Sequence, residues 1–420
     1  MAAPYLCFLL PGVLTMSSSD SFDPSVPDVV VLPTAADAAG EAAQGLLPSG
    51  LSDLLAPQAE QDAKAVETVL SCFAAFSYQR IKPPLVEFEQ TLIAEGPGAA
   101  LADQTFRLLD PISRRMMALR SDMTAQIARI SGTRLARYPR PLRLAYGGEV
   151  MRVVPDVLNP ERQLVQAGAE IIGRDDQQAA TEIIMLGVRA LEQAGITELT
   201  IDLGLPSLAE AILGDELTAM DADIKQQMFS ALSDRDITRL TQLPIKAASS
   251  LAEVIDASGA DSHKLSAIAA RLPEPAAGQL ADLIAIATSL NTIIPSVSIT
   301  IDPLDMQGYG YHTSVSFSIF GAGLKGAIAR GGAYVTGYDE KAMGLSVYME
   351  RVLRALPAPQ QSPVIYIPAD IGLAAGLALV ERGRHVLYGT NGADAEAEAR
   401  ALGCSFILRD AGGMPAPIDG

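Results

Sequence analysis

The stretch LVQAGAEII spans residues 164–172 and alternates polar with apolar side chains. In a strand, this alternation places Gln166, Gly168 and Glu170 on one face and small or aliphatic residues on the other. The aliphatic face is typical of a sheet that packs on a core. Because Gly168 leaves space between two long polar side chains, we expect a concave polar floor that holds a small ligand. A half-exposed strand with solvated polar residues explains the pattern equally well.

Turn and periodicity signals surround this strand with both helices and strands. Asp110-Pro111 is a turn signal and predicts a hairpin between 104–109 and 116–119. Asp122 is expected to cap the helix that follows it. The other expected elements are helices over 62–76 and 177–193, strands over 142–152, 199–203, 297–301 and 315–319, and a last helix that runs from after Gly344 to Leu356. Hairpins with helices beside them predict an α+β fold.

Composition divides the chain into a tail, a large domain and a small domain. Residues 1–45 are expected to form a disordered tail, because residues 16–45 are rich in Ser, Asp, Pro and Ala. The large domain spans 46–356 and includes an Ala- and Leu-rich helical insertion at about 205–290. Residues 361–410 alternate strand and helix signals and predict a small α/β domain.

We expect a cytoplasmic protein. The apolar stretch 2–14 has no Lys or Arg before it and contains two prolines, so it differs from a signal peptide. It is also too short to span a bilayer, and Met16 is a candidate for the true start. Cys7, Cys72 and Cys404 lie far apart and form no CxxC pair, which excludes a disulfide framework and a cysteine zinc site.

Charge and histidine content narrow the functional classes further. The 420 residues carry a net charge of −18, which disfavours binding to the phosphate backbone of a nucleic acid. The three histidines are scattered, so their spacing predicts no metal cluster. No metal, cofactor, nucleic acid or membrane is therefore expected as a partner.

Two local motifs are weak when taken alone. Residues 321–326 (GAGLKG) match the GxGxxG pattern, but Gly331-Gly332 follows too soon for the helix that a dinucleotide site requires. A glycine-rich loop between antiparallel strands explains the match better. Residues 119–124 (LRSDMT) place a carboxylate and a hydroxyl at a helix start, where capping alone explains them. Because no general base or nucleophile stands out, the residues themselves indicate only a polar ligand pocket.

In their order and spacing, four segments resemble the catalytic core of histidyl-tRNA synthetase. They are more similar to the non-catalytic relatives of that enzyme, the regulatory subunits of ATP phosphoribosyltransferase. The resemblance runs from about Leu47 to Leu356, and the last sixty residues show a weaker similarity. It implies a class II aminoacyl-tRNA synthetase-like fold, a six-stranded antiparallel sheet surrounded by helices. The segments are 106–110 (FRLLD), 119–124 (LRSDMT), 141–144 (PLRL) and 166–173 (QAGAEIIG).

Departures from the synthetase pattern favour the non-catalytic relatives. Arg152 matches the first residue of an Arg pair that contacts tRNA and ATP, but Val153 replaces the second. Gln307 replaces an Arg that stabilises the adenylation transition state, and a neutral amide cannot supply that charge. Tyr348 replaces a Gly that leaves room for the adenine. Residues 361–410 contain no Lys and four Arg against six acids, unlike an RNA-reading module.

The residues that hold histidine in the synthetase are better preserved. The resemblance implies a regulatory subunit without catalytic residues that binds the short-form catalytic subunit of ATP phosphoribosyltransferase in a hetero-oligomer. It also implies self-association and feedback inhibition by histidine in the first step of histidine biosynthesis. An active histidyl-tRNA synthetase and a paralogue that binds another amino acid are the alternatives. The implied histidine-binding residues are Asp122, Thr124, Arg152, Gln166, Glu170, Tyr311 and His312, the last in place of a Tyr.

Overall fold

The computed structural model describes seven stretches of the chain. The predicted tail (1–45) and Gln307 lie outside the described residues, so the expectations for them stay predictions. The described stretches are 46–93, 96–155, 160–259, 261–305, 311–359, 362–390 and 394–418.

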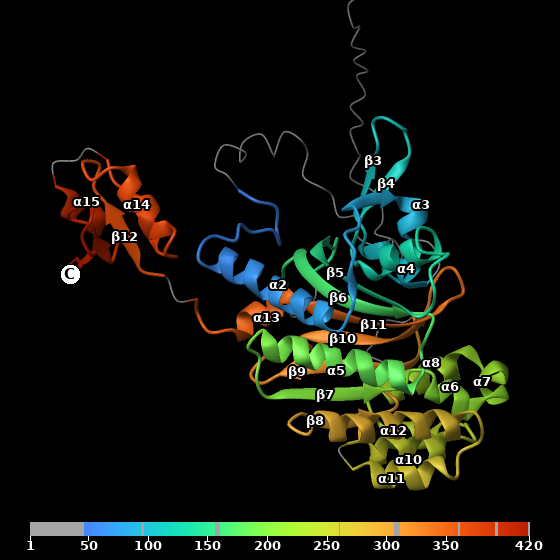
Figure 1. Cartoon of the computed structure of the whole chain (residues 1–420). Coiled ribbons are helices and arrows are strands. Elements are labelled where there is room, and N and C mark those ends of the chain that lie inside the picture. Colours follow the sequence, from blue (N-terminus) through green and yellow to red (C-terminus); the bar gives the residue numbers. More distant parts are fainter. Residues whose placement is uncertain are drawn as a thin grey trace, which may run out of the picture. The chain divides into compact units, whose positions relative to one another are not determined.

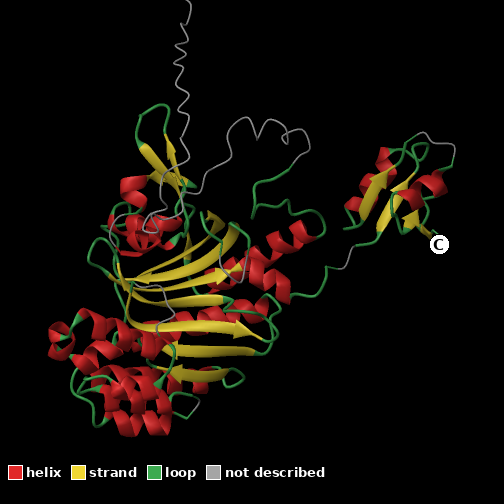
Figure 2. Ribbon diagram, turned by 180° about the vertical axis from the view of Figure 1, so that it is seen from behind, coloured by secondary structure: helices red, strands yellow, loops and turns green. Residues whose placement is uncertain are grey.

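A mixed sheet forms the centre of the large part of the chain (Figures 1 and 2). Within the described residues it has eight strands in the order β1-β5-β6-β11-β10-β9-β7-β8. The six inner strands pair antiparallel, which confirms the expected sheet, whereas the edge strands β1 and β8 pair parallel to their neighbours. The strands are β1 (Gln79–Arg80), β5 (Leu142–Met151), β6 (Gln163–Ile172), β7 (Leu199–Gly204), β8 (Ser298–Asp302), β9 (His312–Gly321), β10 (Ala329–Val335) and β11 (Lys341–Tyr348).

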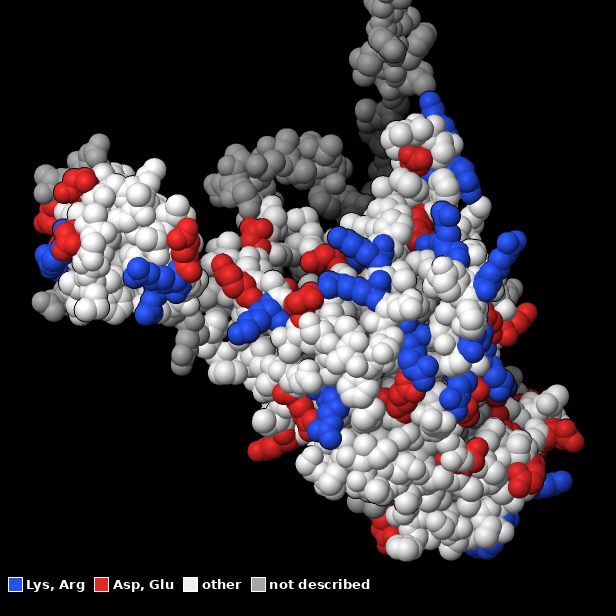
Figure 3. All heavy atoms as spheres, in the orientation of Figure 1, with Lys and Arg blue, Asp and Glu red and all other residues white. Residues whose placement is uncertain are grey.

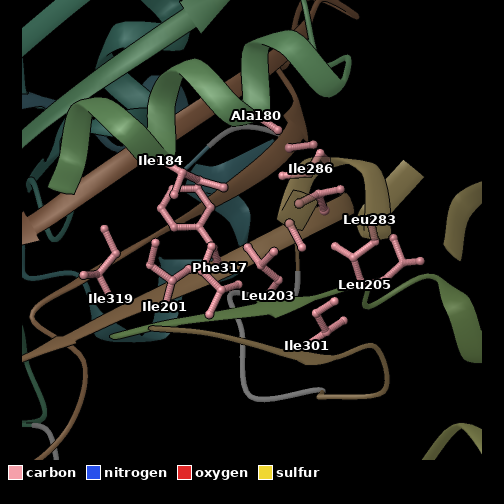
Figure 4. Packing of buried hydrophobic residues seen from close by; sticks show 14 of the residues in the cluster. Ala180, Ile184, Ile201, Leu203, Leu205, Leu283, Ile286, Ile301, Phe317 and Ile319 are labelled. Carbon is pink, nitrogen blue, oxygen red and sulfur yellow. The ribbon is translucent and has the colours of Figure 1, made fainter. Parts of the chain in front are cut away.

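One face of this sheet is apolar and is covered by helices. Helices α2 (Gln58–Ala75), α5 (Gln177–Gln193), α12 (Ala276–Ile293) and α13 (Met349–Ala355) pack on it and share one hydrophobic core with the strands. In Figure 4, Ala180 and Ile184 of α5 lie opposite Leu203 and Phe317 of the strands. Alternation along β6 therefore directs Ala167, Ala169 and Ile171 to this core, and Gln166 and Glu170 to the other face.

Helix α5 begins and ends where its sequence predicts. The side chain of Asp176 accepts a hydrogen bond from the backbone N–H of Ala179, which caps the first turn. Gly195 follows the helix with φ +99°, a conformation that favours glycine, and its N–H bonds to the carbonyl of Glu192. Gly187 lets the helix approach the sheet, because a Cβ there would lie 2.9 Å from Cδ2 of Leu345.

Smaller elements complete the structure. The predicted hairpin is confirmed, and the Asp110 carboxylate accepts bonds from the N–H groups of Ile112 and Ser113 at its turn. No described helix combines the length and hydropathy needed to cross a bilayer. The hairpin region contains β2 (Val86–Phe88), α3 (Glu89–Leu92), η2 (Gly96–Gln104), β3 (Arg107–Leu109), β4 (Met116–Leu119) and α4 (Thr124–Gly132). Between β7 and β8 lie α6 (Leu208–Leu213), α7 (Asp215–Ala219), α8 (Ala222–Ser233), α9 (Ile237–Gln242), α10 (Ala248–Ala257), α11 (Ser262–Ala269) and α12.

The C-terminal segment forms its own four-stranded sheet, ordered β13-β12-β14-β15. Its first three strands are parallel neighbours, as the alternation of strand and helix signals predicts. The last strand pairs antiparallel and was not expected from the sequence. The elements are β12 (Val364–Ile367), α14 (Leu373–Val380), β13 (His385–Tyr388), α15 (Ala395–Ala401), β14 (Phe406–Ile407) and β15 (Ala416–Pro417).

Three expectations for local structure are corrected. Asp122 is not the N-cap of α4, which begins at Thr124 after Met123. The last helix begins at Met349 and not directly after Gly344, because β11 continues to Tyr348 between two partner strands, and it ends at Ala355, next to the expected Leu356. The first hairpin strand begins at Arg107, since Gln104 ends the 3-10 segment η2. The GxGxxG stretch does connect the antiparallel strands β9 and β10, as the simpler interpretation predicts.

Positive charge gathers on one part of the surface despite the overall negative charge. Figure 3 shows Lys and Arg side chains over the hairpin, α3 and α4. Residues 129–143 contain five Arg and no acid. Three of them form ion pairs that tie neighbouring elements together: Arg129 with Glu87, Arg140 with Glu340 and Arg143 with Glu182. Much of this cluster therefore supports the fold.

Truncation of a core residue in α5 should measure how much this packing contributes. Ile184 is 0% exposed, so we expect Ile184→Ala to lower the free energy of unfolding by about 2–5 kcal/mol. Ile293, at the end of α12, is 45% exposed and serves as the matched control, with an expected change within about 0.5 kcal/mol. Thermal or urea unfolding monitored by circular dichroism distinguishes the two variants. Equal losses would contradict the assigned core.

Candidate functional site

The face of the sheet opposite α5 carries a run of polar residues across neighbouring strands. Gly168 pairs with Tyr146 on β5 and with Ser346 on β11, and Ser346 pairs with Arg330 on β10. One row further along the strands, Glu170 pairs with Gly344, which pairs with Gly332. Directly paired residues point to the same side of a sheet, so these rows form one polar floor.

Glu170 lies at the centre of this floor and is 0% exposed. The hydroxyl of Tyr146 donates to its Oε1 (3.1 Å), and the hydroxyl of Tyr334 donates to its Oε2 (3.0 Å). Gly344 makes room for the carboxyl group, because a Cβ at that position would overlap Oε2. Burial raises the pKa of Glu170 to about 8, although the two tyrosine hydroxyls act in the opposite direction.

Gln166 anchors a second part of the network. Its Oε1 accepts a bond from the backbone N–H of Met123 (2.9 Å), and its Nε2 donates to Oδ2 of Asp122 (2.8 Å) and Oγ of Ser346 (2.8 Å). The other oxygen of Asp122 accepts the N–H of Thr124 (2.7 Å). Residues that were predicted from two separate motifs are thus joined directly.

Thr124 links the two halves of the network. Its hydroxyl lies 3.2 Å from the hydroxyl of Tyr146, which lies 3.4 Å from Oγ of Ser346. A continuous chain of hydrogen bonds therefore runs from Asp122 through Gln166 and Ser346 to Glu170. Because buried polar networks hold their groups in fixed geometry, this arrangement is suited to recognising a polar ligand.

The predicted space above Gly168 is not open to a ligand. The ring of Tyr146 fills it, and a Cβ at Gly168 would overlap that ring. The expectation of a cavity between Gln166 and Glu170 is therefore wrong. A narrow pocket lies instead on the Glu170 side, over β10 and β11. Its lining includes Thr124, Glu170, Tyr311, His312, Arg330, Gly332, Tyr334, Gly344 and Ser346.

Tyr311 and His312 form the wall of this pocket. Gly332 makes room for the imidazole, since a Cβ there would lie 3.0 Å from two of its ring atoms. The ring of Tyr311 stands edge-on to the rings of His312 (5.0 Å) and Tyr334 (6.1 Å). Burial, with a contribution from Arg330, lowers the pKa of His312 to about 4, so its imidazole is neutral at pH 7.

Arg152 is not among the residues that line this pocket. It follows the end of β5, where its backbone bridges to Thr105. The residue of β5 opposite Gln166 is Gly148, and at about 3.3 Å per residue Arg152 lies roughly 13 Å further along the strand. Its charge acts on Glu350, whose pKa burial raises and Arg351 and Arg152 lower.

Tyr348 and Arg351 form a separate buried group at that end of the sheet. The guanidinium of Arg351 lies 5.2 Å from the ring centre of Tyr348 and donates to the carbonyl of Ala327 (2.6 Å). These contacts hold the ring of Tyr348 in place, and the residue is only 8% exposed.

Four site residues were not predicted from the sequence: Tyr146, Ser346, Arg330 and Tyr334. Tyr146 and Ser346 lie on the two strands that pair with β6. Arg330 and Tyr334 lie on β10, one strand further away. Tyr146 lies within the predicted strand 142–152. Alternation along that strand was the one signal in the sequence for the face to which Tyr146 points. The partner strands were needed before the four residues could be placed at one site.

Replacement of Glu170 by Gln should change how stability depends on pH. The unfolded chain loses the Glu170 proton near pH 4.5, whereas the folded chain holds it to about pH 8. The group's contribution to stability is therefore full below pH 4.5 and is lost as pH rises to 8, a loss on the order of 4 kcal/mol. We expect Glu170→Gln to remove this loss, measured by urea unfolding at pH 5 and 8.5.

Glu182 provides a control of opposite sign. Hydrogen bonds from Arg143 lower its pKa, so its contribution is present above its ordinary pKa and lost in acid. Glu182→Gln should therefore destabilise the protein at pH 8.5. If Glu170→Gln behaved in the same way, Glu170 would be charged and paired in the folded protein.

The comparisons with known proteins agree with the fold. The sequence profile of the histidyl-tRNA synthetase family matches residues 50–352. A relative from Rhodospirillum rubrum, an ATP phosphoribosyltransferase regulatory subunit, is 39% identical over 375 residues, which cover 88% of this chain and 97% of the relative.

Two solved structures share the architecture. An ATP phosphoribosyltransferase regulatory subunit/histidyl-tRNA synthetase from Bacillus halodurans aligns with a TM-score of 0.73 and 22% identity over 85% of this chain and 96% of its own. A chain of the ATP phosphoribosyltransferase (HisG:HisZ) complex from Thermotoga maritima aligns with a TM-score of 0.52 and 17% identity, over 69% of this chain and 97% of its own. At these identities the two structures establish the fold.

Proposed function

The chain belongs to the ATP phosphoribosyltransferase regulatory subunits, which share the histidyl-tRNA synthetase fold, and we propose that it binds histidine in the pocket beside Glu170. The observation that carries this proposal is the buried network of Asp122, Thr124, Gln166 and Glu170. These residues match those that hold histidine in the synthetases. A zwitterionic amino acid bearing an imidazole offers donors and acceptors to such a network.

The chain is a non-catalytic subunit of an enzyme. Val153 replaces the second Arg of the synthetase pair, and the Rhodospirillum rubrum relative, which matches 88% of this chain, is a regulatory subunit. The subunit therefore acts on a reaction only through a partner.

We infer that this partner is the short-form catalytic subunit of ATP phosphoribosyltransferase, in a cytoplasmic hetero-oligomer in which this chain also self-associates. A subunit without chemistry changes a reaction by favouring one state of its partner. Histidine must bind the complex differently in the active and inactive states if it is to inhibit the reaction. The family name of the relatives supports the partner, and the Glu170 network supports the ligand.

An adenylation assay tests the absence of chemistry. We expect no pyrophosphate exchange with histidine and ATP, because Val153 and Gln307 replace arginines and Tyr348 replaces a glycine. Gln307→Arg alone should remain inactive, since the other two replacements affect separate steps. Exchange by the wild-type chain at synthetase-like rates would contradict the regulatory assignment.

Reconstitution with the catalytic subunit tests the regulation. Addition of this chain should raise the activity of the catalytic subunit, and histidine should lower it again by roughly 5–150-fold, the range of typical coupling energies. Glu170→Ala should keep the activation and lose most of the inhibition, because a lost charge-assisted hydrogen bond weakens binding by about 1.5–3 kcal/mol.

Exposed Glu381 of the C-terminal segment provides the matched control. Glu381→Ala should keep both activation and inhibition. If the Glu170→Ala complex stayed fully sensitive to histidine, the inhibitory site would lie elsewhere and the proposed pocket would be rejected.

A further inference from the structure

The pocket beside Glu170 contains a positive charge that the family resemblance does not assign. Arg330 lies on the polar face of β10 and is directly paired with Ser346 on β11 and Ser318 on β9. It lines the pocket together with Glu170 and His312. Among the described lining residues it is the sole Lys or Arg, and the neutral imidazole of His312 adds no positive charge at pH 7.

The acidic and the basic side chains near the pocket belong to different strands. Glu170 lies on β6, and Asp122 bonds to Gln166 of the same strand. Arg330 lies two strands away on β10, which corresponds to about 10 Å across the sheet. Glu170 and Arg330 therefore line the same pocket from different strands, with Ser346 on the strand between them.

This polarity restricts the chemistry of a ligand. A phosphate or another multiply charged anion would meet only one guanidinium, and on the β6 side it would meet the buried carboxyl group of Glu170, whose raised pKa an anion would raise further. The narrow pocket also leaves little room to hydrate such an anion. A simple cation would meet the guanidinium. A zwitterion satisfies both sides, since its ammonium group favours the ionised form of Glu170 beside it and its carboxylate meets the arginine. The planar fork of Arg also matches a carboxylate with two parallel hydrogen bonds.

We propose that Arg330 binds the α-carboxylate of the amino acid that occupies this pocket. The inference rests on the proposed histidine pocket and extends it, because it assigns the carboxylate end of the ligand to a residue on β10. Arg330 is thus a specificity-determining residue: it favours an amino acid over the corresponding amine. Arg330 and His312 line the same pocket, so the guanidinium charge acts on the space that the ligand would occupy.

Calorimetric titration of the full chain with histidine and with histamine, which lacks the carboxylate, tests the assignment. The wild type should bind histidine more tightly than histamine. Arg330→Met should weaken histidine binding roughly 10- to 150-fold, the loss typical of a charged hydrogen bond, and should leave histamine binding unchanged. Arg330→Lys keeps the positive charge but lacks the planar guanidinium. Its affinity for histidine should therefore lie between those of the wild type and Arg330→Met.

Arg382→Met, at an exposed position of the C-terminal segment, is the control and should bind both ligands as the wild type does. Thermal unfolding of each variant verifies that it folds. Equal losses for histidine and histamine in Arg330→Met would show a structural role and overturn the proposal. Unchanged histidine binding would place the carboxylate elsewhere. If the wild type bound neither ligand, the histidine pocket itself would fail, and this proposal with it.

Discussion

The carboxyl group of Glu170 is buried in the middle of a sheet, and the geometry of the site depends on how the fold accommodates it. A buried carboxyl group is costly unless its oxygens are bonded. Tyr146 and Tyr334, on strands at either side, donate to its two oxygens, and Gly344 leaves the space that the group needs. The register of four strands is therefore coupled to one side chain.

The two faces of the sheet divide the tasks of the protein. The apolar face packs on α2, α5, α12 and α13 and supplies most of the hydrophobic core. The other face can then hold Glu170, Gln166 and Arg330 without loss of that core. This division lets the residues of one face change while the core on the other face stays intact.

The sequence predicted what depends on local periodicity and missed what depends on pairing between strands. Alternation placed Gln166 and Glu170 on one face, because a strand's period is independent of its neighbours. It could not show that Tyr146 would lie opposite Gly168 and fill the expected space. Residues 345–348 were assigned to the last helix for the same reason: an apolar run suits either a helix or a buried strand, and pairing with β6 and β10 makes these residues a strand. Arg330 and Tyr334 could be assigned to the site only after the register of β10 was known.

Whether this subunit is regulated through its amino-acid site depends on where histidine binds. A crystal structure of the full chain grown with histidine would locate the ligand. We expect density for one histidine per chain between Glu170 and Arg330, with Tyr311 and His312 against it. Histidine bound at another surface, or a pocket that stays empty at saturating histidine, would rule out the Glu170 site.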